Sequence, residues 1–110
     1  ELHGLKDRIP YRENIDGRIE NVYLLRIINK DQHDHTFVLD ATGIEGLRLD
    51  GKQSFEVAAG EIVSTPVSLS AEFEALEPGA NNVQFVLKSV DDESIHRSSS
   101  STFIGPQARY

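Results

Sequence analysis

The sequence contains no cysteine, and this absence removes several classes of chemistry at once. Without a thiol, the chain cannot form a disulfide, ligate an iron–sulfur cluster through cysteine, build a thiolate zinc site or use a cysteine nucleophile. It leaves the redox compartment open, because proteins without cysteine occur in oxidising and reducing compartments alike.

Methionine, tryptophan and long apolar runs are also missing. Because there is no Met, the first residue is not a native start, and we expect the chain to be a fragment of a longer protein. No apolar run approaches the ~20 residues that a transmembrane helix needs, and no signal peptide is visible. We therefore expect any membrane segment of the parent protein to lie outside this chain.

The chain is acidic and has the length of one domain, with 110 residues and a formal net charge of -7. A nucleic-acid partner requires a basic face, and so does docking on anionic lipid. The charge therefore argues against both partners. We interpret the negative charge as an aid to solubility rather than as an acidic recognition surface.

The most strongly apolar stretch runs from Arg18 to Lys30, where six of the seven residues from Val22 to Ile28 are apolar. Asp16-Gly17 before it is a turn signal, so the stretch reads as a central strand. Side chains two apart share one face of a strand. Since Arg26 marks the solvent face, we predict that the inward residues are Tyr23, Leu25 and Ile27.

Other segments alternate in the same way, at residues 8–13, 35–41, 55–57, 61–70, 82–90 and 95–104, with a brief extended piece at 47–49. Their predicted inward residues are Phe37, Leu39, Phe55, Val57, Val63, Val67, Leu69, Val83, Phe85, Leu87 and Phe103. Pro66 predicts an edge position or a bulge. Ser98 to Ser101 has the composition of a linker, but its place between Ile95 and Phe103 favours an exposed edge strand. Residues 71–80 are expected to form a loop with one helical turn.

About seven strands at regular spacing, without periodic helices, predict an all-β fold, an immunoglobulin-like antiparallel β-sandwich without a disulfide. One aromatic residue in most strands would supply much of its core. We expect a linker or lead-in at residues 1–7, the sandwich at 8–106 and a tail at 107–110.

His33 and His35 are the candidate metal ligands, because residues two apart on an extended chain can offer two imidazoles to one copper or zinc ion. The alternative is a solvated turn, since Lys30, Asp31 and Gln32 stand beside them. The acidic residues near strand ends, Asp91, Asp92, Glu93, Glu72, Glu74 and Glu77, are expected to be solvated. No Ser–His–Asp order, nucleophile elbow or phosphate loop is present, so no catalytic residue is predicted and we expect no enzyme.

Several strings in the chain resemble one family. They are Tyr11-Arg12-Glu13, the diagnostic run from Gly17 to Tyr23, Ile27 to Lys30, Gly46-Leu47, Ala58 to Glu61 and Phe103 to Pro106. Together they resemble the C-terminal domain of FixG-related proteins, also called CcoG-type cytochrome c oxidase accessory proteins.

The resemblance implies an immunoglobulin-like domain on the periplasmic side of the bacterial inner membrane. It also implies a parent membrane protein whose cysteines hold [4Fe–4S] clusters and which assists assembly of the cbb-type oxidase, with a part in copper handling. The resemblance also implies that this fragment binds no cofactor of its own and that the clusters belong to the rest of the parent protein. Oxidase subunits or copper chaperones are the expected protein partners, and the oligomeric state is open.

Three hypotheses follow for the chain itself. The first is a non-catalytic interaction domain with sheet edges, such as Arg8 to Glu13 or Ile95 to Ile104, where a partner strand could add. The second is a copper relay through His33 and His35; it requires that the double change His33→Ala and His35→Ala lower copper affinity in a titration. The third, a carbohydrate-binding or adhesive sandwich, rests on fold analogy and would show exposed aromatics.

Overall fold

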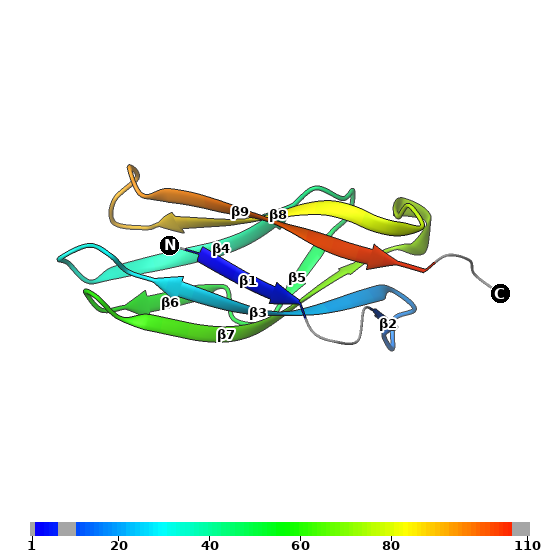
Figure 1. Cartoon of the computed structure of the whole chain (residues 1–110), viewed down its shortest axis with the longest axis horizontal. Helices are drawn as coiled ribbons and strands as arrows, with labels where there is room; N and C mark the ends of the chain where they lie inside the picture. The colour runs from blue at the N-terminus through cyan, green and yellow to red at the C-terminus, as the bar shows by residue number, and fades with distance from the viewer. Residues whose placement is uncertain (1, 7–10, 107–110) are drawn as a thin grey trace.

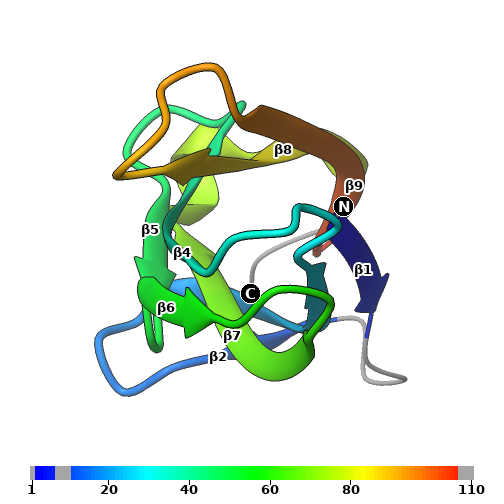
Figure 2. The ribbon, with the colours of Figure 1, turned by 90° about the vertical axis from the view of Figure 1, so that its left-hand side faces the viewer.

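The computed structural model describes residues 2–6 and 11–106, with side chains from residue 11 onward. Two antiparallel sheets stack face to face (Figures 1 and 2). The strands are β1 (Leu2–Lys6), β2 (Arg12–Glu13), β3 (Ile19–Ile28), β4 (His35–Thr42), β5 (Arg48–Asp50), β6 (Ser54–Val57), β7 (Ile62–Ala71), β8 (Gly79–Ser89) and β9 (His96–Gly105). In this part of the chain no helix is long and apolar enough to cross a membrane.

One sheet has the order β1-β3-β7-β5, with β2 also paired to β3, and the other has the order β6-β4-β8-β9. The predicted all-β sandwich is confirmed. The count of about seven strands was too low, because the described residues form nine. The brief piece at 47–49 is a paired strand, β5, and β1 had not been expected at all.

The N-terminal segment differs from the predicted lead-in. Leu2–Lys6 pairs along β3, from Leu2 opposite Ile27 to Lys6 opposite Tyr23. Strand pairing joins backbone groups, so a polar segment can take a sheet edge without leaving an apolar pattern in the sequence. The predicted strand at 8–13 overlaps β2 at Arg12–Glu13, while its residues 8–10 and the predicted tail at 107–110 lie outside the described residues.

The core lies between the inner faces of the two sheets. Tyr23, Leu25 and Ile27 are buried and Arg26 is exposed, as predicted. The other predicted inward residues are buried too, except Val63, which is half-buried. Each large apolar side chain removed from water contributes about 1.5–3 kcal/mol to folding. These side chains therefore supply most of the driving force for stacking the sheets.

Three further predictions about the strands are confirmed. β5 pairs with β7 only at Ser68–Ser70, so no strand of the described ranges neighbours β7 on that side at Pro66. The loop after β7 contains one short helical turn, Phe73–Ala75. The serine run belongs to β9, an edge strand in the sheet order.

Polar side chains of β3 join the two sheets at the edge strand β9. The Asn21 amide donates to the carbonyl of Ile104 at 3.0 Å, and the Ile104 amide donates to Asn21 Oδ1 at 2.8 Å. The Tyr23 hydroxyl donates to the carbonyl of Thr102 at 2.7 Å, and its ring meets Phe85 edge-on at 5.1 Å. Burial raises the pKa of Tyr23, so the hydroxyl stays protonated and keeps its role as donor.

Tyr23→Phe removes this hydroxyl and leaves the aromatic packing in place. We expect a loss of about 1–2 kcal/mol in the free energy of unfolding, because a part-buried carbonyl loses its donor. Urea unfolding followed by circular dichroism measures it. Tyr11→Phe, at an exposed tyrosine, is the matched control and should leave stability unchanged. Equal stability of the two variants would contradict the role given to Tyr23.

Candidate functional site

Three loops meet at one end of the sandwich, the end that faces the viewer in Figure 2. They are residues 29–34, 58–61 and 90–95, which follow β3, β6 and β8. Buried Asn29 ties the first two loops together, because its side-chain amide donates to the carbonyls of Val57 at 2.9 Å and His33 at 2.8 Å. Its backbone carbonyl accepts from the Gly60 amide at 2.9 Å. The loops are therefore held by internal hydrogen bonds.

His35 ties the first and third loops together. Its Nε2 lies 2.6 Å from Asp31 Oδ2 and its Nδ1 lies 2.9 Å from Asp91 Oδ2. The Ser89 hydroxyl donates to the second oxygen of Asp91 at 2.9 Å. A ring with a carboxylate at each nitrogen is held best as an imidazolium, which donates from both. His35 therefore clamps two loops to the start of β4.

This charge arrangement shifts three pKa values. The hydrogen bond to Asp31, supported by Asp91, raises the pKa of His35 above its usual value, against the opposing effect of burial. The same bond lowers the pKa of Asp31. The hydroxyl of Ser89, followed by the backbone amide of Thr36, lowers the pKa of Asp91. All three shifts favour the charged forms.

The two predicted metal ligands differ in their surroundings. His35 is buried and both of its ring nitrogens face carboxylates, whereas the His33 side chain is exposed. A metal at His35 would have to displace Asp31 or Asp91 from the imidazole. Among the described residues no group of three or more His, Asp or Glu side chains is placed to hold a metal ion. This arrangement does not fit a copper site, and the copper relay stays an untested prediction.

The other candidate groups of the sequence do not converge. Asp92 accepts from the Ser94 hydroxyl at 2.6 Å within its own turn, and Glu93 is exposed. At the opposite end of the molecule, Glu72 pairs with buried Arg18 at 3.0 Å. Exposed aromatics, the signature of a carbohydrate-binding surface, are limited to Tyr11 within the described residues.

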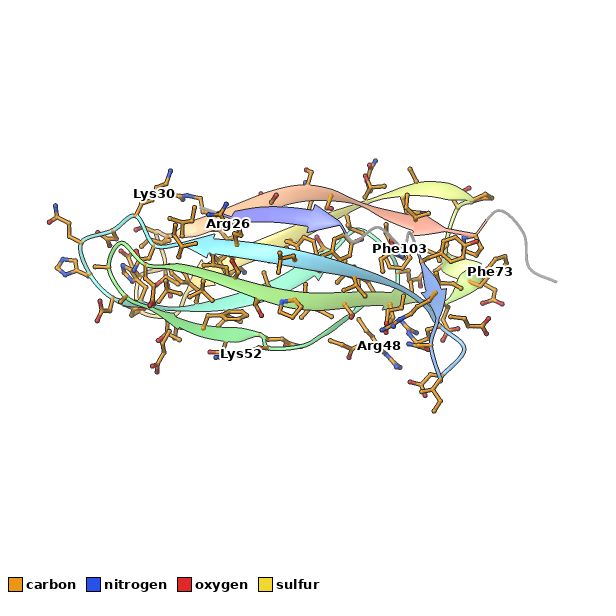
Figure 3. The ribbon with its side chains drawn as sticks, turned by 60° about the horizontal axis from the view of Figure 1, so that its bottom comes forward. Arg26, Lys30, Arg48, Lys52, Phe73 and Phe103 are labelled. Atoms are coloured by element: carbon orange, nitrogen blue, oxygen red, sulfur yellow. The ribbon has the colours of Figure 1, made fainter. Side chains whose placement is uncertain are left out.

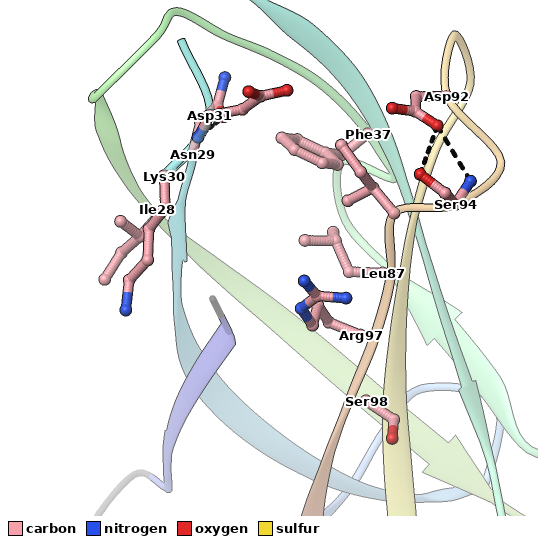
Figure 4. A pocket seen from close by; sticks show the side chains of 11 residues that line it. Ile28, Asn29, Lys30, Asp31, Phe37, Leu87, Asp92, Ser94, Arg97 and Ser98 are labelled. Atoms are coloured by element: carbon pink, nitrogen blue, oxygen red, sulfur yellow. Dashed lines mark hydrogen bonds between the residues drawn. The ribbon is translucent and has the colours of Figure 1, made fainter. Parts of the chain in front are cut away.

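A cavity of about 690 Å³ opens between the two sheets at the loop end. Its floor includes the buried side chains of Phe37 and Leu87, and its rim includes Asp31 and Asp92. Figure 4 shows Arg97 reaching from β9 into this gap, toward the end of β3. The sequence did not reveal this feature, because it depends on where β3 and β9 separate.

Comparison with known proteins identifies a family and a similar solved structure. Residues 1–106 match the family model described as "IG-like fold at C-terminal of FixG". The chain belongs to the FixG C-terminal domain family. The crystal structure of a FixG-related protein from Vibrio parahaemolyticus is similar, with 30% sequence identity, a TM-score of 0.84, and coverage of 96% of this chain and 94% of that chain. No curated protein matches the chain.

The residues most diagnostic for the FixG resemblance, Gly17 to Tyr23, have structural roles in the fold. Gly17 has φ +78° in the turn that precedes β3. Arg18 is buried, and its guanidinium donates to the carbonyls of Gly46 at 2.8 Å and Ser70 at 2.9 Å. Asn21 and Tyr23 join the sheets. In this part of the FixG domain the side chains of Arg18, Asn21 and Tyr23 therefore hold the fold together.

The hydrogen bonds of His35 to Asp31 and Asp91 predict how the stability of the fold depends on pH. Because its pKa is raised in the folded chain, His35 contributes stability that is full below its unfolded pKa, about 6.5, and is lost as pH rises through the folded value. The lowered pKa values of Asp31 and Asp91 make their contribution full above about pH 4 and lost on further acidification. The stability difference between the unchanged chain and His35→Gln should therefore be largest between these limits.

Urea unfolding from pH 3 to pH 9 tests the clamp. The control is His96→Gln, at an exposed histidine of β9, which should shift the curve little at any pH. If His35→Gln follows the unchanged chain in parallel across the whole range, the imidazole is not held between charged carboxylates.

Proposed function

We propose that this chain is a non-catalytic interaction domain of a FixG-like membrane protein. In this proposal the parent is an iron–sulfur oxidoreductase that supports assembly of the cbb-type oxidase and the handling of its copper. The domain lies on the periplasmic side of the inner membrane and docks a protein partner, such as an oxidase subunit or a copper chaperone.

One observation carries the proposal. Every buried side-chain nitrogen or oxygen of the described residues has a hydrogen-bond partner within the fold. A catalytic site usually aims a polar group into a cleft toward its substrate. Here the buried polar residues Arg18, Asn21, Asn29 and His35 hold strands and loops together. What such a rigid sandwich offers to other molecules is its surface.

The family supports the larger context of the proposal. Its description places this fold at the C-terminus of FixG, so the domain accompanies other parts of a longer protein. The chain has no Cys, so any cysteine-bound cluster belongs to those other parts. The resemblance to oxidase accessory proteins supplies the expected process.

Deleting residues 11–106 from the parent protein tests the function. We expect less assembled oxidase in the membrane, measured by haem spectra and oxidase activity, because the partner loses its docking surface. The iron content of the truncated parent should stay unchanged, since this chain cannot ligate a cluster through cysteine. The 110-residue chain, used as bait, should retain an oxidase subunit or a copper chaperone. Normal oxidase assembly after the deletion would refute the proposal.

A further inference from the structure

The two sheets differ in the side chains that they turn outward. Between residues 22 and 28, the outward residues of β3 oppose those of β7 in four pairs. The pairs are Val22 with Ser68, Leu24 with Pro66, Arg26 with Ser64 and Ile28 with Ile62. Directly opposed side chains on one face of an antiparallel pair are neighbours, so these eight residues form one surface, the β3–β7 face. Two of its four pairs are wholly apolar.

The outer face of the other sheet is more polar. Its central strands are β4 and β8, and their outward pairs are Val38 with Lys88, Asp40 with Val86 and Thr42 with Gln84. Each of these pairs contains a polar residue, as expected of a sheet face that meets water. The sandwich fold itself therefore does not require the apolar pairs of the β3–β7 face.

The apolar side chains of the β3–β7 face are accessible to another molecule. Ile62 is 50% exposed, Leu24 is 43% exposed, and Pro66 is exposed as well. Val22 and Ile28 are half-buried. Removal of apolar surface from water is the main favourable term in most protein association. An exposed apolar patch rimmed by polar residues is typical of a protein–protein interaction site.

One cation lies within this patch. Arg26 is exposed and stands between the two apolar pairs, and in Figure 3 it lies toward the end of β3 that carries Lys30. None of the ion pairs among the described residues involves Arg26. Asp50 of β5 stands opposite Ser68, at the other end of the face. A guanidinium among apolar side chains is complemented best by a carboxylate on the molecule that covers it.

From these features we propose that the β3–β7 face docks a partner protein through a surface that is apolar and carries an acidic residue for Arg26. The inference rests on the proposed function and names the docking face and the partner's chemistry. A second copy of this chain fits the face less well, because a two-fold interface would bring two Arg26 side chains together between chains of net charge -7. The same net charge disfavours an anionic lipid surface.

The apolar part of the face is tested by surface plasmon resonance on the immobilised 110-residue chain. The probes are the detergent-solubilised cbb-type oxidase and a purified copper chaperone, each titrated separately. The double variant Leu24→Ser with Ile62→Ser should weaken binding about tenfold or more, because truncating buried interface anchors raises the dissociation constant. Val38→Ser with Val90→Ser removes two exposed aliphatic side chains outside the face, and this matched control should bind as the unchanged chain does.

Arg26→Glu tests the charge of the face. It should weaken binding of the same probe about tenfold or more, because it sets two carboxylates against each other. Lys88→Glu makes the same change of charge at an exposed residue of the other sheet and should bind normally. The urea midpoints of all these variants should stay close to that of the unchanged chain, since every substituted side chain is at the surface. This comparison separates lost docking from lost folding.

Four outcomes would overturn the inference. They are no saturable binding of either probe up to about 100 μM, equal binding by the unchanged chain and the variants of the face, a dimer in sedimentation that these variants dissociate, and flotation with phosphatidylglycerol vesicles that they abolish.

The parent protein separates this inference from the proposed function. Normal oxidase assembly with Leu24→Ser and Ile62→Ser, but not with the domain deleted, would reject this face and leave the proposed function standing. Normal assembly with both would reject the proposed function.

Discussion

The backbone groups of β9 impose the constraint on which this domain depends. An edge strand has a row of N–H and C=O groups without a neighbour in its own sheet. Here two side chains of β3, in the other sheet, bind backbone groups of β9: Asn21 binds Ile104 and Tyr23 binds Thr102. These bonds hold the two sheets together where β3 and the C-terminal half of β9 lie side by side. Toward the loop end β1, which pairs with β3, lies beside β9, and a cavity opens at the end of the sandwich.

Both ends of the sandwich are fastened by polar residues. At one end Arg18 donates to Ser70 and Gly46, and at the other Asn29 and His35 connect the loops. Because these groups are buried and paired, they order loops that would otherwise be free to move. The molecule therefore presents its surface on a fixed frame, which lowers the entropy cost of binding a partner.

Alternation of apolar and polar residues was enough to predict the sandwich and its inward side chains, such as Leu25, Phe85 and Phe103. It worked because burial of one strand face leaves a period of two in the sequence. β1 was not predicted, because it joins the sheet through its backbone groups, which leave no apolar pattern in the sequence. The hydrogen bonds of Arg18, Asn21 and His35 could not be predicted from the sequence for another reason. The partners of Arg18 and Asn21 are 28 to 83 residues away along the chain, and the two carboxylates that bind His35 lie on opposite sides of it in sequence. The serine run predicted an edge strand, but no local pattern could show that β1 lies beside it.

Backbone amide hydrogen exchange of the 110-residue chain, followed by NMR at neutral pH, tests the bond between β3 and β9 most directly. The structure predicts slow exchange at Ile104, whose amide donates to Asn21 Oδ1. Asn21→Ala should speed exchange at Ile104 and leave exchange unchanged at Leu39, whose amide donates to the carbonyl of Gln53. Equal exchange at Ile104 in the unchanged chain and in Asn21→Ala would show that the Asn21 side chain does not hold β9, and would contradict the account.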